Sequence, residues 1–140
     1  MDKRDLRIDD WVNVEMNIQT HEMKPIRIKQ ILSRCIKTQY LMNLDPPFEI
    51  LYPIELTESL IVKNKIAICE GCYGIWNIGT DITLEKHEDY WVVSVANDIN
   101  VYEKKIKYLH QLQHELWDAG ENINIECYES KQDRQKESLR

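Results

Sequence analysis

The sequence has few cysteines, no long apolar run and no catalytic signature, and each absence excludes a class of protein. Its 140 residues include four cysteines, too few for a small scaffold held together by disulfide bonds. The longest uncharged, apolar-rich run covers residues 90–96, far short of the ~20 residues that cross a bilayer. The charged opening MDKRDLRIDD has no apolar signal region, so we expect a cytoplasmic protein with reduced thiols and no membrane partner. No catalytic or nucleotide-binding signature is present, and function has to be argued from the fold and from single side chains.

Positive charge is scarce in the middle of the chain. The net charge is −6, and residues 41–100 hold three basic and ten acidic side chains. This balance argues against non-specific nucleic-acid binding, which depends on neutralising phosphates. It leaves open a basic protein partner or an acidic mimic of nucleic acid, although a solvated acidic surface is the commoner explanation.

One long helical pattern, residues 104–119, is present. Its apolar side chains fall on one side of a 3.6-residue wheel and must face a core; they are Tyr102, Ile106, Leu109, Leu112, Leu116, Trp117 and Ala119. Gly120 is the usual residue just after a helix end. Gln113 interrupts the apolar side, and His110 lies at its edge.

Shorter alternating stretches predict antiparallel strands. We expect them at residues 11–14, 26–32, 36–42, 48–52, 66–69, 72–78, 82–85, 90–95 and 123–125, with a loop at 15–22. Thr57 can cap a short helix at 58–63. Trp91, Val93 and Val95 share a face that suits the long helix. The predicted fold is therefore α+β: a curved antiparallel sheet, open or barrel-like, in a single domain of residues 1–128, followed by a disordered charged tail at 129–140.

Three stretches, LRIDDWVN, YPIELTESLIVKN and IKYLHQLQ, resemble a family of uncharacterised small proteins encoded by phages and mobile elements of gut bacteria. The resemblance brings no known activity. It implies a genomic setting in which small proteins often act against host defences. In that family an asparagine is common at the place of His114, and the Cys69/Cys72 pair is not typical, which argues against essential roles for these residues.

A polar cluster on the long helix suggests a small-molecule site. Spacings of three and four residues bring His110, Gln113 and Trp117 along one helix edge, where they offer hydrogen bonds and a stacking plane. In the alternative, Gln113 satisfies a buried sheet or loop carbonyl, which is the commoner fate of a buried glutamine.

Two motifs raise the question of metal. His110, His114 and Asp118 lie four residues apart on one helical row, yet HELWD lacks the second histidine of the metalloprotease motif. Cys69 and Cys72 have the spacing of half a zinc site, but a second pair is missing. Partly exposed histidines and small buried thiols are the commoner explanations, and we expect no metal or other cofactor.

The function that these features favour is a non-enzymatic binding protein that sequesters a small nucleotide-derived ligand at a homo-oligomer interface. Arg27 and Lys29 lie on one face of a predicted strand, where they could bind an anion or simply keep a sheet edge soluble. Trp76 is a further candidate, because strand alternation does not explain its position. The candidate ligand-binding residues are His110, Gln113, His114, Trp117, Trp76, Arg27 and Lys29. Two alternatives stay open: an acidic inhibitor of a host protein, and a metal-dependent hydrolase built on His110, His114 and Asp118.

Overall fold

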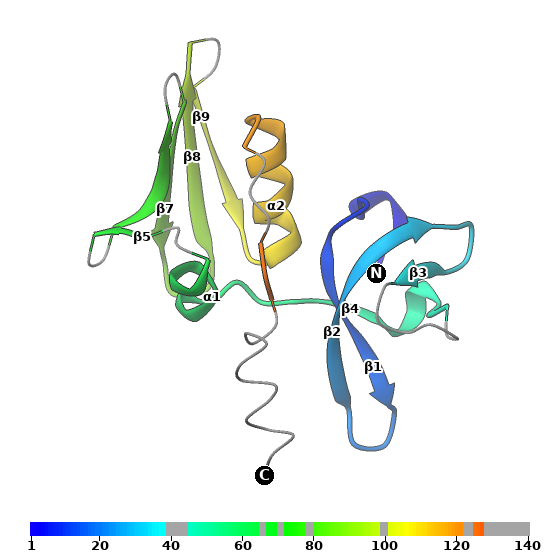
Figure 1. The fold of residues 1–140 in the computed structure, drawn as a ribbon. Helices are drawn as coiled ribbons and strands as arrows, with labels where there is room; N and C mark the ends of the chain where they lie inside the picture. Colours follow the sequence, from blue (N-terminus) through cyan, green and yellow to red (C-terminus); the bar gives the residue numbers. More distant parts are fainter. Residues whose placement is uncertain are drawn as a thin grey trace, which may run out of the picture.

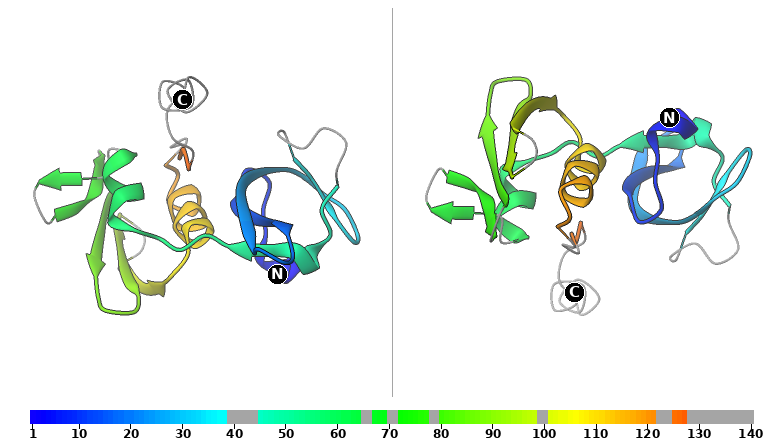
Figure 2. Two further views of the ribbon diagram at one scale, coloured as in Figure 1. Left: turned by 90° about the horizontal axis from the view of Figure 1, so that it is seen from below. Right: turned by 90° about the horizontal axis from the view of Figure 1, so that it is seen from above.

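The structure is a computed structural model that describes residues 1–38, 45–64, 67–69, 72–77, 80–98, 101–121 and 125–127. Two antiparallel sheets and one longer helix make up this part of the chain, which confirms the predicted α+β class (Figure 1). Neither sheet closes into a barrel among the described strands, although the first one curls strongly when seen from above or below (Figure 2).

The first sheet has four strands in the order β3-β2-β1-β4. Its members are β1 (Trp11–Asn17), β2 (Glu22–Ile31), β3 (Ile36–Thr38) and β4 (Leu51–Pro53), with the 3-10 turns η1 (Lys3–Asp5) and η2 (Phe48–Ile50) beside them. The predicted loop at 15–22 is wrong at both ends, because cross-strand pairing of Glu15 with Met23 and of Asn17 with Glu22 continues the ladder to a short turn. The strand expected at 48–52 begins only at Leu51, because Phe48–Ile50 forms the turn η2 after two prolines.

The second sheet has five strands in the order β5-β6-β7-β8-β9, each paired with the next one in sequence. Its members are β5 (Ala67–Cys69), β6 (Cys72–Asn77), β7 (Thr80–Lys86), β8 (Trp91–Asn97) and β9 (Val101–Ile106). Cys69 pairs with Cys72 across the predicted hairpin, and the second predicted hairpin is formed by β7 and β8. Helix α1 (Glu58–Lys63) starts at Thr57, whose side chain accepts a hydrogen bond from the N–H of Leu60, as the sequence predicted.

Helix α2 (Leu109–Asp118) lies between the two sheets in all three views (Figures 1 and 2). Its apolar side packs on the face of the second sheet that carries Trp91, Val93 and Val95, as predicted. Gly120 ends the helix with a positive φ of 83°, and the N–H groups of Gly120 and Glu121 bond back to the carbonyls of Trp117 and Leu116.

The helix is shorter at its start than the predicted span of 104–119. Residues 104–106 belong to β9 instead, where Lys104 pairs with Val93 and Ile106 pairs with Trp91. Sheet pairing outweighs helix propensity here, and Ile106 is buried at the end of the strand beside Trp91. The helix then starts at a corner where the N–H of Leu109 bonds to the carbonyl of Ile54.

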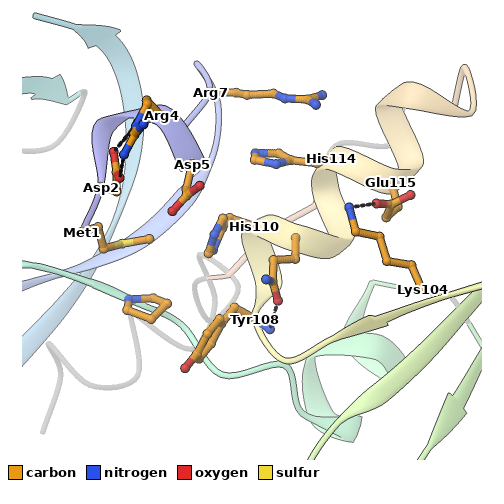
Figure 3. A pocket seen from close by; sticks show the side chains of 12 residues that line it. Met1, Asp2, Arg4, Asp5, Arg7, Lys104, Tyr108, His110, His114 and Glu115 are labelled. Carbon is orange, nitrogen blue, oxygen red and sulfur yellow. Dashed lines mark hydrogen bonds and ion pairs between the residues drawn. The ribbon is translucent and has the colours of Figure 1, made fainter.

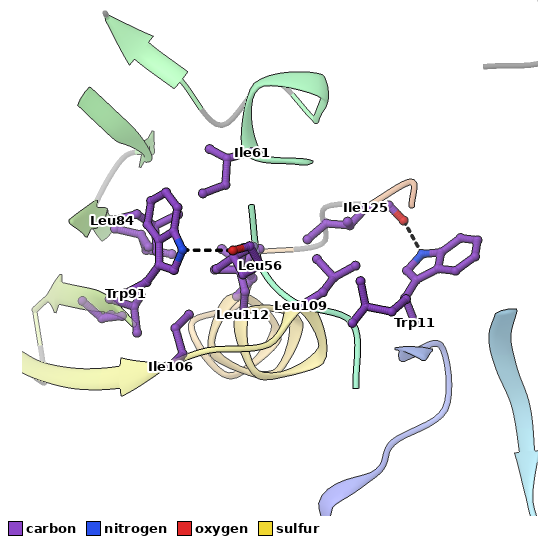
Figure 4. Close-up of a cluster of buried hydrophobic side chains, with 14 residues drawn as sticks. Trp11, Leu56, Ile61, Leu84, Trp91, Ile106, Leu109, Leu112 and Ile125 are labelled. Carbon is purple, nitrogen blue, oxygen red and sulfur yellow. Dashed lines mark hydrogen bonds between the residues drawn. The ribbon is translucent and has the colours of Figure 1, made fainter. Parts of the chain in front are cut away.

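Buried apolar side chains form two clusters rather than one. The larger cluster joins the second sheet to both helices, and its members include Leu56, Ile61, Leu84, Trp91, Ile106, Leu109, Leu112 and Leu116 (Figure 4). Trp11 of β1 also belongs to this cluster, and its indole N–H donates to the carbonyl of Ile125 over 2.6 Å. The smaller cluster lies inside the first sheet and includes Val12, Val14, Ile26, Ile28, Ile36 and Leu51. Trp11 therefore anchors the first sheet in the core of the second.

Some sequence predictions concern residues that the structure does not describe or describes only in part. The tail at 129–140 lies outside the described residues, and the single domain predicted for 1–128 stays a prediction. Of the edge strand predicted at 123–125 only Ile125 is described; it is buried and is not part of a strand.

Candidate functional site

A polar hollow of about 460 Å³ opens beside the first turn of α2, and we name it the α2 hollow. One wall is the segment that contains η1, another is α2, and Pro53 and Lys104 complete the rim (Figure 3). The lining residues are Met1, Asp2, Arg4, Asp5, Arg7, Pro53, Lys104, Tyr108, His110, Gln111, His114 and Glu115. His110 and His114, two of the predicted ligand-binding residues, are thus brought to one hollow.

His114 is fixed by a buried carboxylate. Its Nε2 lies 2.9 Å and 2.8 Å from the two carboxylate oxygens of Asp10, and the Asp10 side chain is fully buried. Because a carboxylate can only accept, Nε2 carries the hydrogen in this contact. The backbone N–H of Arg7 also donates to Asp10, over 2.8 Å. His114 is therefore held in one orientation by a satisfied partner.

His110 has no such partner. Only 4% of its surface is exposed, and its buried Nδ1 has no hydrogen bond to any residue that the structure describes. Burial lowers the pKa of His110, an effect that the charge of Asp10 partly offsets and that of His114 reinforces. The ring stacks on Tyr108 at 6.0 Å and 10°, and its edge meets the ring of His114 at 5.6 Å. A buried nitrogen without a partner is rare in proteins, and the residue that carries this one lines the α2 hollow.

Three cationic side chains surround the hollow, and each pairs with a carboxylate. Arg4 binds Asp2 at 2.9 Å, Arg7 binds Asp118 at 2.8 Å, and Lys104 binds Glu115 at 3.0 Å. The hydrogen bond with Arg7 lowers the pKa of Asp118. The pairs of Arg4 and Arg7 are exposed on both sides and contribute little, so they can be exchanged for contacts with a ligand, whereas the carboxylate of Glu115 is buried.

Glu115 ties the hollow to β9. It is buried, accepts a hydrogen bond from the hydroxyl of Tyr102 over 2.8 Å, and pairs with Lys104 through its other oxygen. Burial, together with this hydrogen bond, raises the pKa of Tyr102 to about 12. Glu115 therefore connects α2 to β9 on this side of the hollow through two polar contacts.

Gln113 does not face the α2 hollow. Its Oε1 accepts from the backbone N–H of Trp11 and its Nε2 donates to the carbonyl of Asp9, both over 2.9 Å. The structure therefore confirms the alternative in which Gln113 satisfies the backbone. Asp9 has a positive φ of 73°, an uncommon conformation for a residue other than glycine, and Gln113 stabilises the backbone at this point.

The other candidate residues lie elsewhere. Arg27 and Lys29 each approach Asp9 at 3.5 Å, and Arg27 also lies over the Trp11 ring at 5.8 Å. Trp117 contacts His114 at a ring distance of 6.0 Å but does not line the hollow. Trp76 belongs to β6, and its side chain lies outside the described part of the structure.

The row His110, His114 and Asp118 does not form a metal site in this geometry. His114 bonds to Asp10, and Asp118 bonds to Arg7. In the described ranges no group of three or more histidine, cysteine, aspartate or glutamate side chains could hold a metal ion. The side chains of Cys69 and Cys72 lie outside those ranges, although their backbones pair across the hairpin.

Chelation is expected to leave the melting temperature of the protein unchanged, because both clusters of buried apolar side chains form without metal ligands. The measurement is thermal unfolding with and without EDTA. A fall of more than about 5 °C, which corresponds to losing roughly 1 kcal/mol in a domain of this size, would contradict this expectation.

Acidification is expected to destabilise the fold through His110. Because its folded pKa is lowered, the unfolded chain binds more protons than the folded one as pH falls below about 6.5. The free energy of unfolding should therefore decrease as pH is lowered through this value and level off below the folded pKa. We expect His110→Asn to lose less stability than the wild type between about pH 7 and pH 5. Chemical unfolding across this range measures both slopes, and equal slopes would contradict the prediction; the exposed His21→Asn is the control.

A second hollow, of about 440 Å³, lies between α1 and the β7–β8 hairpin. Its lining includes the acidic side chains Glu55, Glu58, Glu88 and Asp89 and the basic side chains Lys86 and Lys107. Glu58 already pairs with Lys86 at 2.6 Å. We name it the acidic hollow, because four carboxylates and two lysines line it.

Sequence reasoning missed the wall that faces α2. Asp10, Asp5, Arg4 and Arg7 come from the charged opening of the chain, in which no candidate site residue was predicted. They meet α2 across a separation of more than a hundred residues, as the pair Arg7–Asp118 illustrates. The one available signal was the pair Asp9-Asp10 directly before the buried Trp11, because charged residues next to a buried strand need partners.

Comparison with protein-family models, with curated proteins and with solved structures finds no match. The resemblance to small phage proteins therefore stays a prediction. Among the helices that the structure describes, none is long and apolar enough to cross a membrane.

Proposed function

We propose that this protein is a non-enzymatic binding protein that captures a small nucleotide-derived ligand in the α2 hollow. The observation that carries the proposal is the imidazole of His110, which is almost fully buried, lines the hollow and has an Nδ1 without a partner. A bound ligand would supply the missing hydrogen bond and remove the cost of leaving this nitrogen unsatisfied.

The size and chemistry of the hollow support a nucleotide-like ligand. Its volume of about 460 Å³ falls in the range of sites for small molecules. Arg4, Arg7 and Lys104 can meet a negatively charged group, and the stacked rings of Tyr108 and His110 offer an aromatic surface. The predicted binding at an interface between copies remains part of the proposal, although the described lining comes from one chain.

Capture without reaction is favoured because the arrangement around the histidines lacks a hydroxyl or thiol that is paired with a base as in hydrolases. The described lining contains no serine, threonine or cysteine that His114 could activate. The carboxylate of Asp10 is fully buried and already bonds to His114 and to the backbone of Arg7. Asp10 therefore holds His114 in one orientation, and we infer that the pair serves to bind a ligand and not to transfer a proton.

Native mass spectrometry of the protein purified from cells tests the proposal. We expect a bound species of nucleotide mass that is released intact after denaturation, and the same spectrum reads the number of copies in the complex. His110→Leu should be purified without the species, while His21→Asn, an exposed histidine in the β1–β2 turn, should retain it. A wild-type protein that neither carries a ligand nor binds any of the common nucleotides in a titration would contradict the proposal.

The acidic hollow supports a second candidate, an inhibitor that binds a basic surface of another protein. Four carboxylates against two lysines line it, and unlike charges on a partner would speed association and improve specificity. A basic protein that co-purifies and is lost on replacing Glu88 and Asp89 by lysine would favour this candidate over ligand capture.

A further inference from the structure

We propose that the first turn of α2 is a phosphate seat, in which the backbone N–H and the ring Nδ1 of His110 together hold the phosphate group of the ligand, and that His110 takes up a proton when the phosphate enters. This inference rests on the proposed function and deepens it, because it names the part of the ligand that the α2 hollow recognises.

The start of α2 offers a backbone donor. The N–H of Leu109 bonds to the carbonyl of Ile54 over 2.8 Å, and the N–H of Gln111 bonds to the carbonyl of Tyr108 over 3.1 Å. The N–H of His110, which stands between them, bonds to no group in the described part of the chain. The amide dipoles of this helix of ten residues place partial positive charge at the same point.

The side chain of His110 is the second, independent feature. Its ring is 4% exposed, and Figure 3 shows it directed from α2 into the hollow, toward the wall that carries Asp5. The buried Nδ1 has no partner in the described structure, and because it is buried, a group in the hollow reaches it only when the ring turns. A phosphate oxygen can satisfy Nδ1 and the backbone N–H of the same residue together, and backbone N–H groups at a helix start are a common phosphate contact.

The proton follows from the charge of the group that enters. Burial favours the neutral imidazole while the hollow is empty, whereas an adjacent phosphate favours the imidazolium. The ring then takes one proton from solvent and forms one N–H bond, and no other bond changes. A neutral imidazole donates from one ring nitrogen, whereas an imidazolium donates from both, so Nδ1 of the protonated ring is a donor to the phosphate whichever nitrogen held the hydrogen before.

Charged groups from every neighbouring element act on this ring. Those facing the ring or the hollow are Met1 with its ammonium and Asp2 before η1, Asp5 and Arg4 of η1, Arg7 and Asp10 before β1, Lys104 of β9, and Tyr108, His114 and Glu115 at or within α2. Asp10 is engaged by His114, and the three cations are paired at the rim. For Asp5 the structure gives no side-chain hydrogen bond or ion pair, and its negative charge opposes a phosphate. Asp5→Asn should therefore strengthen binding, which is opposite in sign to the effect of removing His110.

Calorimetric titration tests the seat with defined probes: the four common nucleoside 5′-monophosphates, their nucleosides and inorganic phosphate. Each is titrated near pH 7 in two buffers that differ in ionisation enthalpy, so that proton uptake is measured directly. We expect at least one monophosphate to bind about tenfold or more tightly than its nucleoside, with inorganic phosphate competing and with net proton uptake.

The variants separate the seat from the rest of the hollow. His110→Asn places an amide near the position of Nδ1 but does not titrate, so it should retain part of the affinity and lose the proton uptake that belongs to the ring. His110→Leu should lose about tenfold or more in affinity, Asp5→Asn should gain, and His21→Asn should match the wild type. Comparing wild type with His110→Asn cancels the titration of the phosphate itself.

Three results would overturn the inference. If a monophosphate and its nucleoside bind equally, or if His110→Asn takes up as many protons as the wild type, the phosphate seat is wrong while ligand capture stands. If none of the probes binds, both the seat and the proposed function fail.

Discussion

Replacing Gln113 by leucine should lower the free energy of unfolding by about 2–4 kcal/mol, because it removes the partners of two backbone groups at once. The amide of Gln113 bonds to the N–H of Trp11 and to the carbonyl of Asp9, and its side chain is only 1% exposed. A leucine fills similar space but leaves both groups without a hydrogen bond. The cost should be larger for Trp11, which is fully buried, than for Asp9, which is partly exposed.

Urea unfolding of Gln113→Leu beside Gln30→Leu measures this effect. Gln30 is exposed on β2, so its replacement by leucine should change stability by less than about 0.5 kcal/mol. A loss below about 1 kcal/mol for Gln113→Leu would mean that water or a rearranged backbone satisfies both groups, and the structural role assigned to Gln113 would be wrong.

Replacing Trp11 by alanine should cost about 3–5 kcal/mol, the range for truncating a large buried aromatic side chain. Trp11 is 0% exposed, packs in the cluster of the second sheet and donates a hydrogen bond to Ile125. Because its backbone belongs to β1, its loss also removes the apolar anchor between the two sheets. Both effects act in the same direction.

Two further variants make this prediction specific. Trp11→Phe keeps most of the apolar contact and loses the indole N–H, so it should cost clearly less than alanine. Trp117→Ala removes a tryptophan of the same size that is partly exposed on α2, and it should also cost less. Equal losses for Trp11→Ala and Trp117→Ala in chemical unfolding would contradict the anchoring role.

The parts of the fold that the sequence predicted are those that depend on local pattern. The apolar side of α2, the cap at Thr57 and the hairpins of the second sheet all follow from neighbours within a few residues. Local pattern did not predict where α2 starts, because Lys104 and Ile106 pair with β8 and so belong to β9. The division into two sheets was missed for the same reason: every strand pattern was consistent with one curved sheet.

The candidate site was predicted on one side only. Helical spacing brought His110 and His114 together correctly, but it also placed Gln113 with them, since spacing does not show what a buried amide meets. The contacts of Asp10 with His114 and of Arg7 with Asp118 depend on how the opening segment crosses α2. Such contacts between distant parts of the chain have no signature in a single sequence.

The central claim is that a nucleotide-like ligand binds in the α2 hollow, and a nitrogen–proton correlation spectrum of the labelled protein tests it most directly. Titration with the nucleoside monophosphates should shift the amide signals of η1, Arg7, Lys104 and the first turn of α2, which line the hollow. Signals from the β1–β2 turn and from residues 86–91 at the acidic hollow should stay in place. Shifts that gather at residues 86–91 while those of His110 and its neighbours do not move would contradict the claim.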